Sequence, residues 1–270
     1  MGVLTISREC GSSGDKIAKI ISEKTGYTLL EKNSLEQIID NEPFPDIPLE
    51  KFDEHSPGFW ENFTNEKDIY LDRLRTAVLK TADKGNAVIV GRGAQFILNG
   101  VPGVFKVKIT ASKDFKIQRT AEIIKKDVKT AERYCRKIDH ERNGFCKFFF
   151  GGAWEDPAVY HMVISTDNFT AEETAGIIIN AYKASPLSGE TDSRILKDRL
   201  TAQSVRNNIL YKEKIPIDLL EVECLNGKVK IVGTVSAKLN IQRCTETAMK
   251  TDGVISVDSE VFYIDPVITY

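Results

Sequence analysis

The sequence is poor in the residues that build metal centres and disulfide frameworks. Its 270 residues include five cysteines and three histidines. The cysteines are Cys10, Cys135, Cys146, Cys224 and Cys244. They form no C-x-x-C pair and no cysteine–histidine cluster, and such an odd, unpatterned set favours a reducing compartment over a disulfide framework or a zinc site. His55, His140 and His161 lie too far apart in the sequence to indicate a catalytic triad.

An excess of one charge and a long apolar run are also missing. Lysine and arginine total 37 against 39 acidic residues, which gives a formal net charge of −2 at pH 7. This balance offers no global basic field that would recruit nucleic acid or an anionic membrane. No segment approaches the roughly 20 apolar residues of a membrane span, and the N-terminus lacks the basic-then-apolar pattern of a signal peptide. We therefore expect a cytoplasmic protein with no integral membrane segment and no nucleic-acid partner.

The first 185 residues alternate short apolar runs with helical patterns. Runs such as A-V-I-V at 87–90 are apolar on consecutive residues, which is typical of strands covered on both faces. The expected strands are Val3–Ser7, Tyr27–Leu30, Ala87–Gly91, Val104–Ile109 and Met162–Ser165. The expected helices span 14–24, 33–40, 64–84, 112–126, 129–143 and 170–183. This alternation predicts an α/β domain over residues 1–184 with a doubly wound, five-stranded parallel sheet.

Two other segments shape the expected organisation. Residues 41–60 hold four of the nine prolines and little periodicity, so we expect a long, mobile surface segment that could be functional. Residues 185–193 form a short polar linker. Beyond it we expect a helix over 194–210, strands at Leu219–Leu225, Val229–Val235 and Val254–Ile264, and a helix over 237–250. Because Asn226-Gly227 is a strong hairpin signal and the order α-β-β-α-β cannot continue a parallel sheet, residues 194–270 are predicted to form a second, small α+β domain.

The turn after the first strand is a candidate phosphate-binding loop. Its residues are Arg8, Gly11, Ser12, Ser13, Gly14 and Asp15. Glycines let successive backbone amides converge on one anion, and the following helix adds its N-terminal donors. The simpler interpretation is a glycine-rich turn capped by a serine. The standard loop also carries a lysine for the β- and γ-phosphates and a hydroxyl for Mg²⁺. Here Gly14 stands in the position of that lysine, so Lys16 and Arg8 are the alternative cations and Ser13 is the candidate Mg²⁺ ligand.

Four segments of the sequence resemble the cytidylate kinase-like family. The stretch I-S-R-E-C-G-S-S-G at 6–14 is similar to the loop with which that family opens. The other segments are G-R-G-A at 91–94, Asp139–Arg142 and Asp156–Thr166, in the same order along the chain. The resemblance implies a P-loop kinase relative that binds ATP and Mg²⁺. The implied activity is transfer of a phosphoryl group to a nucleoside monophosphate, with CMP- or dCMP-like acceptors favoured.

Arg92 is the candidate clamp for the acceptor phosphate. It follows a buried strand at its carboxyl end, where ligands bind in open α/β sheets, and its planar fork matches phosphate oxygens. The alternative is a structural arginine that pairs with a loop carboxylate. Gly93 is a second candidate at the acceptor site, because CMP kinases, which the resemblance brings in, have at this position an acidic residue that helps to read the base. Lys32, after the second expected strand, is a further candidate at the acceptor site.

The basic run from Arg119 to Arg142 is the candidate lid. Taken alone, such a run is usually a solvated helix face. Transfer of a phosphoryl group nevertheless needs cations around the moving group, and the resemblance implies a mobile lid that supplies them. Arg142 is the first candidate for the catalytic charge, followed by Arg136, Arg119 and Lys16. The aromatic residues near Gly151 either form an apolar lid hinge or offer a ring for base stacking.

The C-terminal segment resembles a BON domain. The resemblance rests on residues 222–235, with the strand–Asn-Gly–strand pattern, and on T-D-G-V-I-S-V at 251–257. It implies a small module with a ligand still to be identified or a membrane-sensing role, and it leaves a homodimer possible. Two functions from different classes remain open for the whole chain. One is phosphotransfer to a nucleoside monophosphate; the other is a catalytically weak, nucleotide-binding regulatory protein.

Overall fold

In the computed structural model, the described residues are 2–31, 34, 38–39, 42–45, 64–188 and 193–265. Most of the helix expected over 33–40 and most of the proline-rich segment 41–60 lie outside them. Along the described helices, none combines the length and the apolar character that crossing a bilayer requires.

The N-terminal part is built on a five-stranded parallel sheet, as the sequence predicts. The strands are β1 (Val3–Arg8), β2 (Thr28–Leu30), β3 (Ala87–Val90), β4 (Val104–Thr110) and β5 (Met162–Ser165). Their order in the sheet is β2-β3-β1-β4-β5, and every neighbouring pair is parallel. The central strand β1 therefore ends between β3 and β4, and this position brings the segments that follow the three strands to one edge.

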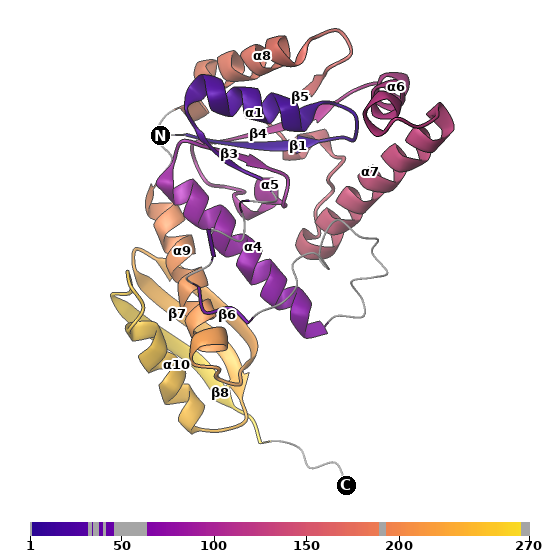
Figure 1. Ribbon diagram of the computed structural model, residues 1–270. Coiled ribbons are helices and arrows are strands. Elements are labelled where there is room, and N and C mark those ends of the chain that lie inside the picture. Colours follow the sequence, from indigo (N-terminus) through magenta and orange to yellow (C-terminus); the bar gives the residue numbers. More distant parts are fainter. Residues whose placement is uncertain are drawn as a thin grey trace.

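Helices cover both faces of this sheet, which explains the apolar strands. On one face α1 (Gly14–Thr25) and α8 (Ala171–Ala184) pack together, while α4 (Thr64–Lys84) and α5 (Ala94–Ile97) lie on the other (Figure 1). Successive residues of β1 enter the two separate cores: Val3 packs with the α4 side and Leu4 with the α1 side. A strand with alternate residues in two cores has no solvated face.

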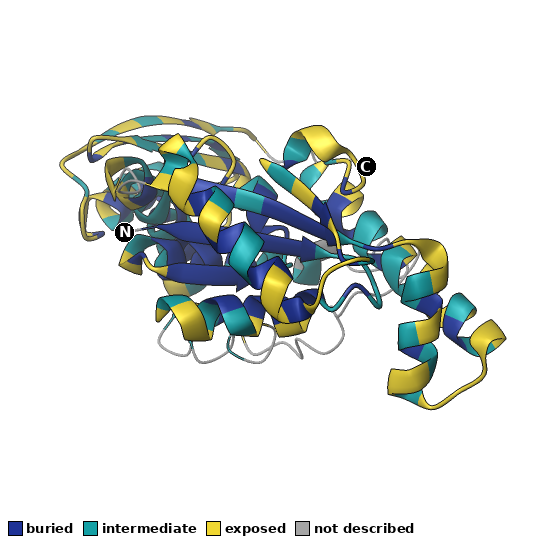
Figure 2. Cartoon of the chain, turned by 90° about the horizontal axis from the view of Figure 1, so that it is seen from above, coloured by how far each residue is buried: buried dark blue, intermediate teal, exposed yellow. Residues whose placement is uncertain are grey.

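A helical hairpin projects from the sheet domain (Figure 2). It consists of α6 (Lys113–Ile124) and α7 (Val128–Phe150). The sequence indicates the end of this second helix near residue 143, but α7 continues for seven more residues until Gly151 ends it with a φ of 60°. The aromatic residues before Gly151 are therefore the last turns of the helix, and Phe145 is buried in the core shared with α4.

The C-terminal part has the α-β-β-α-β order that the sequence predicts. Its elements are α9 (Ser193–Asn207), a π-helical turn (Asn208–Lys212), β6 (Asp218–Leu225), β7 (Lys228–Val235), α10 (Leu239–Met249) and β8 (Ser256–Tyr263). β6 and β7 form an antiparallel hairpin, whereas β8 pairs parallel to β7. Asn226 and Gly227 both have positive φ, at 52° and 76°, as a type I′ hairpin turn requires.

A buried carboxylate joins the two parts of the chain. Asp72 on α4 is 1% exposed. It accepts hydrogen bonds from three residues of the C-terminal part, which are Gln203 at 2.9 Å, Arg206 at 3.0 Å and Tyr211 at 2.7 Å. A buried charge is tolerated only when it is paired and hydrogen-bonded. The network therefore holds α9 against α4, and Arg206 extends it to the backbone carbonyl of Leu220 on β6.

We expect Asp72→Asn to lower the free energy of unfolding by about 2–4 kcal/mol, because Arg206 would keep its buried charge without the opposite charge. Urea denaturation measures this change. Asp68→Asn removes the same charge from an exposed position on the same helix, and its effect should stay within about 0.5 kcal/mol. Equal effects of the two substitutions would show that the buried network does not stabilise the domain contact.

Candidate functional site

Two residues of the loop between β1 and α1 have left-handed backbone angles. Gly11 has a φ of 76° and Ser13 a φ of 63°. A side chain on Gly11 would collide with the backbone of α6, since its Cβ would lie 2.5 Å from the carbonyl oxygen of Lys116. Ser12 closes the turn, because its amide and its hydroxyl both donate to the carbonyl of Glu9, at 3.3 and 2.8 Å. The loop is thus packed closely against the hairpin of α6 and α7, which contains the candidate lid residues and is called the lid hairpin below.

The loop amides divide into two groups. Those of Cys10 and Ser12 are bonded within the protein, the first to Asp139 Oδ1 at 2.7 Å and the second to Glu9. Within the described part of the chain, the amides of Gly11, Ser13 and Gly14 make no hydrogen bond. The buried hydroxyl of Ser13 also has no partner there. These donors stand at the N-terminus of α1, whose dipole favours an anion.

Arg8 lies across this helix terminus. Its Nε pairs with Asp15 at 2.9 Å, and its side chain is 16% exposed. The aliphatic stem packs on Gly14, where an added Cβ would lie 2.2 Å from Arg8 Cβ, and its Nη1 would be 2.6 Å from a Cβ on Gly91. Both glycines therefore leave room for the arginine, which reaches from the phosphate loop to the segment after β3.

Two further arginines meet Arg8 at the carboxyl edge of the sheet. Arg142 of α7 donates from Nη1 to the carbonyl oxygen of Arg8 at 2.9 Å, and its side chain is 12% exposed. Arg92 follows β3 and donates to the hydroxyl of Tyr70 at 3.0 Å. The three guanidinium groups line one small cavity. The tertiary fold thus brings together residues 8, 92 and 142, which the sequence analysis selected from separate segments.

Phe150 packs beside Arg92. An added Cβ on Gly93 would lie 2.0 Å from its ring, and the ring stacks on Phe96 with centroids 5.5 Å apart and planes 17° from parallel. Trp154 is 3% exposed and Phe145 5% exposed. The aromatic residues at the end of α7 therefore pack against the body of the domain and against each other. This arrangement supports the apolar packing role considered in the sequence analysis.

A cluster of buried charges links the loop to the lid hairpin. Lys116 of α6 lies 2.8 Å from Glu9 and 3.4 Å from Asp139, and Asp139 lies 3.7 Å from Arg142. Burial favours the neutral form of Glu9. The hydrogen bonds from Lys116 and Thr110, together with the charges of Lys116 and Lys108, outweigh burial and lower the pKa of Glu9. For Asp139 burial prevails and raises its pKa, despite the amide of Cys10 and the nearby cations. Burial opposes the charge of Lys116, yet its contacts with Glu9 and Asp139 raise its pKa.

A cavity of about 440 Å³ opens beside this cluster, between α6 and α7. The residues that line it include Glu9, Lys116, Arg136, Asp139 and Trp154. The size is within the range of small-molecule sites. Charged groups of both signs therefore face a space next to the phosphate loop.

The remaining candidates are less closely grouped. The side chain of Arg136 is 73% exposed and pairs with Glu132 at 3.4 Å. That of Lys16 is 57% exposed and pairs with Glu172 of α8 at 3.1 Å. Arg119 lies half-buried on α6 and lines neither of the two cavities described above. Lys32 lies outside the described residues.

Sequence reasoning missed Lys108 and Lys116. Lys108 is 5% exposed on β4, and its Nζ donates to the carbonyl oxygen of Trp154 at 3.2 Å and lies 4.3 Å from the centre of the indole ring. A lysine in the middle of a buried strand was the signal available for it. Lys116 has no comparable signal, because a lysine on an amphipathic helix is ordinarily solvated.

Comparisons with known proteins find a sequence family and solved structures that are similar to this chain. No curated protein matches the chain. A solved structure of an uncharacterized protein from Eubacterium ventriosum ATCC 27560 has a TM-score of 0.55 and 24% identity, covering 68% of this chain and 100% of that chain. Shikimate kinase from Acinetobacter baumannii in complex with shikimate has a TM-score of 0.40 and 14% identity, covering 68% of this chain and 96% of that chain.

A gluconokinase from Sinorhizobium meliloti 1021 has a TM-score of 0.37 and 15% identity, covering 78% of this chain and 97% of that chain. The sequence model of the cytidylate kinase-like family matches residues 3–168. The match spans the whole parallel sheet, the phosphate loop and the lid hairpin. Because it extends over more than half of the chain, the protein belongs to the cytidylate kinase-like family.

Proposed function

We propose that the protein transfers a phosphoryl group from ATP to a nucleoside monophosphate, with a CMP- or dCMP-like acceptor. The observation that carries the proposal is that Arg8, Arg92 and Arg142 line one cavity, while Arg8 also packs on Gly14, whose amide makes no hydrogen bond among the described residues. Phosphoryl transfer requires little covalent chemistry from the protein and depends on positioning and on cations around the transferred group. Three arginines from three segments at the carboxyl edge of the sheet suit that requirement.

The loop residues fit ATP and Mg²⁺ in two respects. The amides of Gly11, Ser13 and Gly14 are available to phosphate oxygens, and the buried Ser13 hydroxyl has no partner among the described residues. In P-loop proteins the group that holds Mg²⁺ is a serine or threonine hydroxyl directly after the loop lysine. Asp15 stands at that place here, so the hydroxyl would come from Ser13, two residues earlier. When bound, Mg²⁺ would neutralise charge on the phosphates. Arg8, whose stem covers Gly14, would supply the cation that a loop lysine supplies elsewhere.

The arginines then have distinct roles. Arg92 would hold the acceptor phosphate through its planar fork, and Arg142 would face the charge that develops on the moving phosphoryl group. Arg142 belongs to α7, so closure of the lid hairpin would bring it to the phosphates and exclude water. No covalent intermediate is needed, because an oxygen of the acceptor phosphate would attack the γ-phosphorus directly while the bond from the γ-phosphorus to the bridging oxygen breaks and ADP leaves.

A second function is favoured by the loop itself. It lacks the lysine, and the amides of Cys10 and Ser12 are already bonded within the protein. These features suit a regulatory protein that binds a nucleotide without turnover, with the C-terminal BON-like domain (residues 194–270) as its ligand- or membrane-sensing module. The two functions differ in acceptor-dependent release of ADP.

We expect Arg142→Ala to lower kcat by about a hundredfold or more, because removal of one preorganised donor from a developing charge has this effect. The measurement is a coupled ADP-release assay with each nucleoside monophosphate. Arg133→Ala is the matched control on the same helix, and we expect a change of less than about threefold, since this arginine is exposed and lines neither cavity of the candidate site.

Stimulation of the wild-type protein by one acceptor supports phosphotransfer. Tight ATP binding with no acceptor-dependent release of ADP would contradict it and support the regulatory alternative. Equal losses in the two variants would contradict the assigned role of Arg142.

We expect Gly14→Ala to weaken ATP binding by about tenfold or more. The new Cβ would lie 2.2 Å from Arg8 Cβ and would displace the arginine that covers the loop. Isothermal titration calorimetry with ATP and Mg²⁺ measures the effect. Gly176→Ala on α8 is the control, because its Cβ meets no atom within 4 Å of the described structure. Unchanged affinity in Gly14→Ala would place the nucleotide elsewhere.

A further inference from the structure

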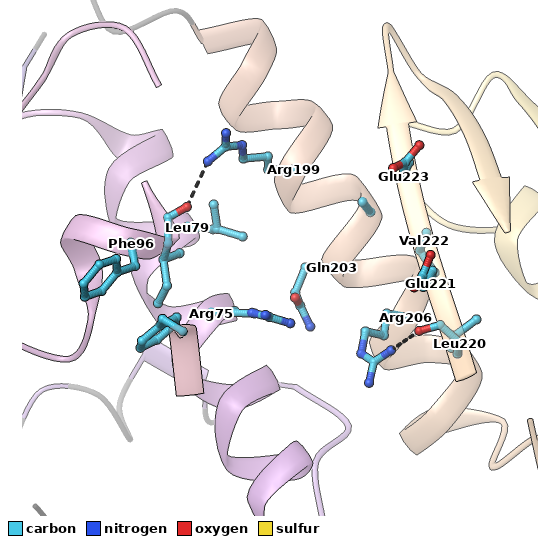
Figure 3. A pocket seen from close by; sticks show the side chains of 13 residues that line it. Arg75, Leu79, Phe96, Arg199, Gln203, Arg206, Leu220, Glu221, Val222 and Glu223 are labelled. Carbon is cyan, nitrogen blue, oxygen red and sulfur yellow. Dashed lines mark hydrogen bonds between the residues drawn. The ribbon is translucent and has the colours of Figure 1, made fainter. Parts of the chain in front are cut away.

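A third cavity lies between the sheet domain and the C-terminal part (Figure 3). Its volume is about 480 Å³, and its walls come from α4, α5, the end of α7, α9 and β6. This size and an inter-domain position are both typical of small-molecule sites. The cavity is separate from the phosphate loop, since none of its lining residues belongs to the loop.

Arg75 supplies a cation to this cavity, and no described residue is bonded to it as a counterion. Arg75 is half-buried, and it has no hydrogen-bond or ion-pair partner among the described residues. In Figure 3 its side chain extends from α4 towards Gln203 on α9. Burial lowers the pKa of Arg75, the nearby Asp72 opposes this shift, and the charge of Arg206 adds to it. A desolvated guanidinium without a partner is costly, so an anion at this position would be stabilised.

The other two arginines of the cavity are already engaged. Arg199 donates to the carbonyl oxygens of Ile97 and Asn99 at 2.9 and 2.8 Å. Arg206 donates to Asp72 and to the carbonyl oxygen of Leu220. They contribute positive potential to the same space and fix the positions of its walls. Arg75 is therefore the arginine of this cavity whose donors remain available to a ligand.

An aromatic wall and an acidic wall of the cavity limit the kind of ligand that it can hold. Phe96 and Phe150 form a stacked pair at its wall, which offers an apolar surface for a flat group. Glu221 and Glu223 on β6 are exposed at the other side, where a second anionic group would be repelled. A ligand with one anionic group and one flat apolar part matches both features.

We propose that this cavity binds a small organic anion, a carboxylate or a phosphate monoester with a planar ring. Its anionic group would pair with Arg75, and its ring would lie against Phe96 and Phe150. This site is independent of the proposed phosphotransfer.

The cavity also shares a wall with the candidate active site. Phe150 is the last residue of α7, the helix that carries Arg142, and its ring contacts Gly93 beside Arg92. Phe96 belongs to α5, which begins after Gly93. A ligand that holds this aromatic pair would therefore favour one position of α7 and change the affinity of the phosphate loop for a nucleotide. This coupling rests on the proposed function.

The test is a titration of the full chain with 2-naphthoate, with binding measured by isothermal titration calorimetry. We expect saturable binding of 2-naphthoate and binding at least about tenfold weaker for 2-naphthamide, which has the same shape without the charge. Arg75→Gln should weaken 2-naphthoate binding by about tenfold or more without lowering the melting temperature, because Arg75 holds no partner. Lys84→Gln removes a charge from an exposed position on the same helix and should leave the affinity unchanged.

A second titration with phenyl phosphate distinguishes a carboxylate ligand from a phosphate ligand. If phenyl phosphate binds more tightly than 2-naphthoate, and if Arg75→Gln abolishes this binding, the natural ligand is a phosphate. The site is overturned if 2-naphthoate and phenyl phosphate both fail to bind, or if both bind Arg75→Gln as tightly as the wild-type protein.

ATP affinity measured with and without saturating 2-naphthoate tests the coupling. A change of at least about threefold supports it, and an unchanged affinity overturns it. Failure of ATP to bind under both conditions contradicts the proposed phosphotransfer and leaves the 2-naphthoate site standing.

Discussion

The carboxylate of Asp139 is the interaction on which the geometry of the candidate site depends. It accepts the amide of Cys10 at 2.7 Å, lies 3.4 Å from Lys116 and 3.7 Å from Arg142. These contacts join α7 to the phosphate loop and to α6. A buried carboxylate must be paired to be tolerated, so the lid hairpin and the loop are held together in this conformation. As a result Arg142 donates a hydrogen bond to the carbonyl oxygen of Arg8, at the start of the loop.

A second buried carboxylate, Asp72, has the corresponding role between the two parts of the chain. It holds α9 against α4 and so creates the wall of the inter-domain cavity that carries Arg75. The end of α7 reaches both places, because Phe150 lines this cavity and also contacts Gly93. The lid helix thus extends from one candidate ligand site to the other. Such a helix is a physical route by which the C-terminal part could influence a nucleotide site.

Much of the fold could be predicted from residue patterns because the relevant forces are local or periodic. Runs such as A-V-I-V indicated strands covered on both faces, and Asn226-Gly227 indicated the β6–β7 hairpin, since few other residues adopt two consecutive positive φ angles. The end of α7 was placed too early. Its aromatic residues have no helical preference of their own, and packing of Phe145 into the core extends the helix.

The sequence alone determined the sheet, the glycine-rich loop and the identity of the arginines that could meet there. The positions of the strands follow from apolar runs, and the freedom of the loop backbone follows from glycine. Both can be read along the chain. The tertiary structure decided which cations gather. Arg8 and Arg142 lie together, whereas Lys16, only two residues beyond Gly14, turns to Glu172 on α8. It also decided that Lys116 and Asp72 are engaged in buried pairs. These outcomes depend on contacts between residues far apart in the sequence. The partner of a buried charged residue is set by the fold and cannot be read from the residue itself.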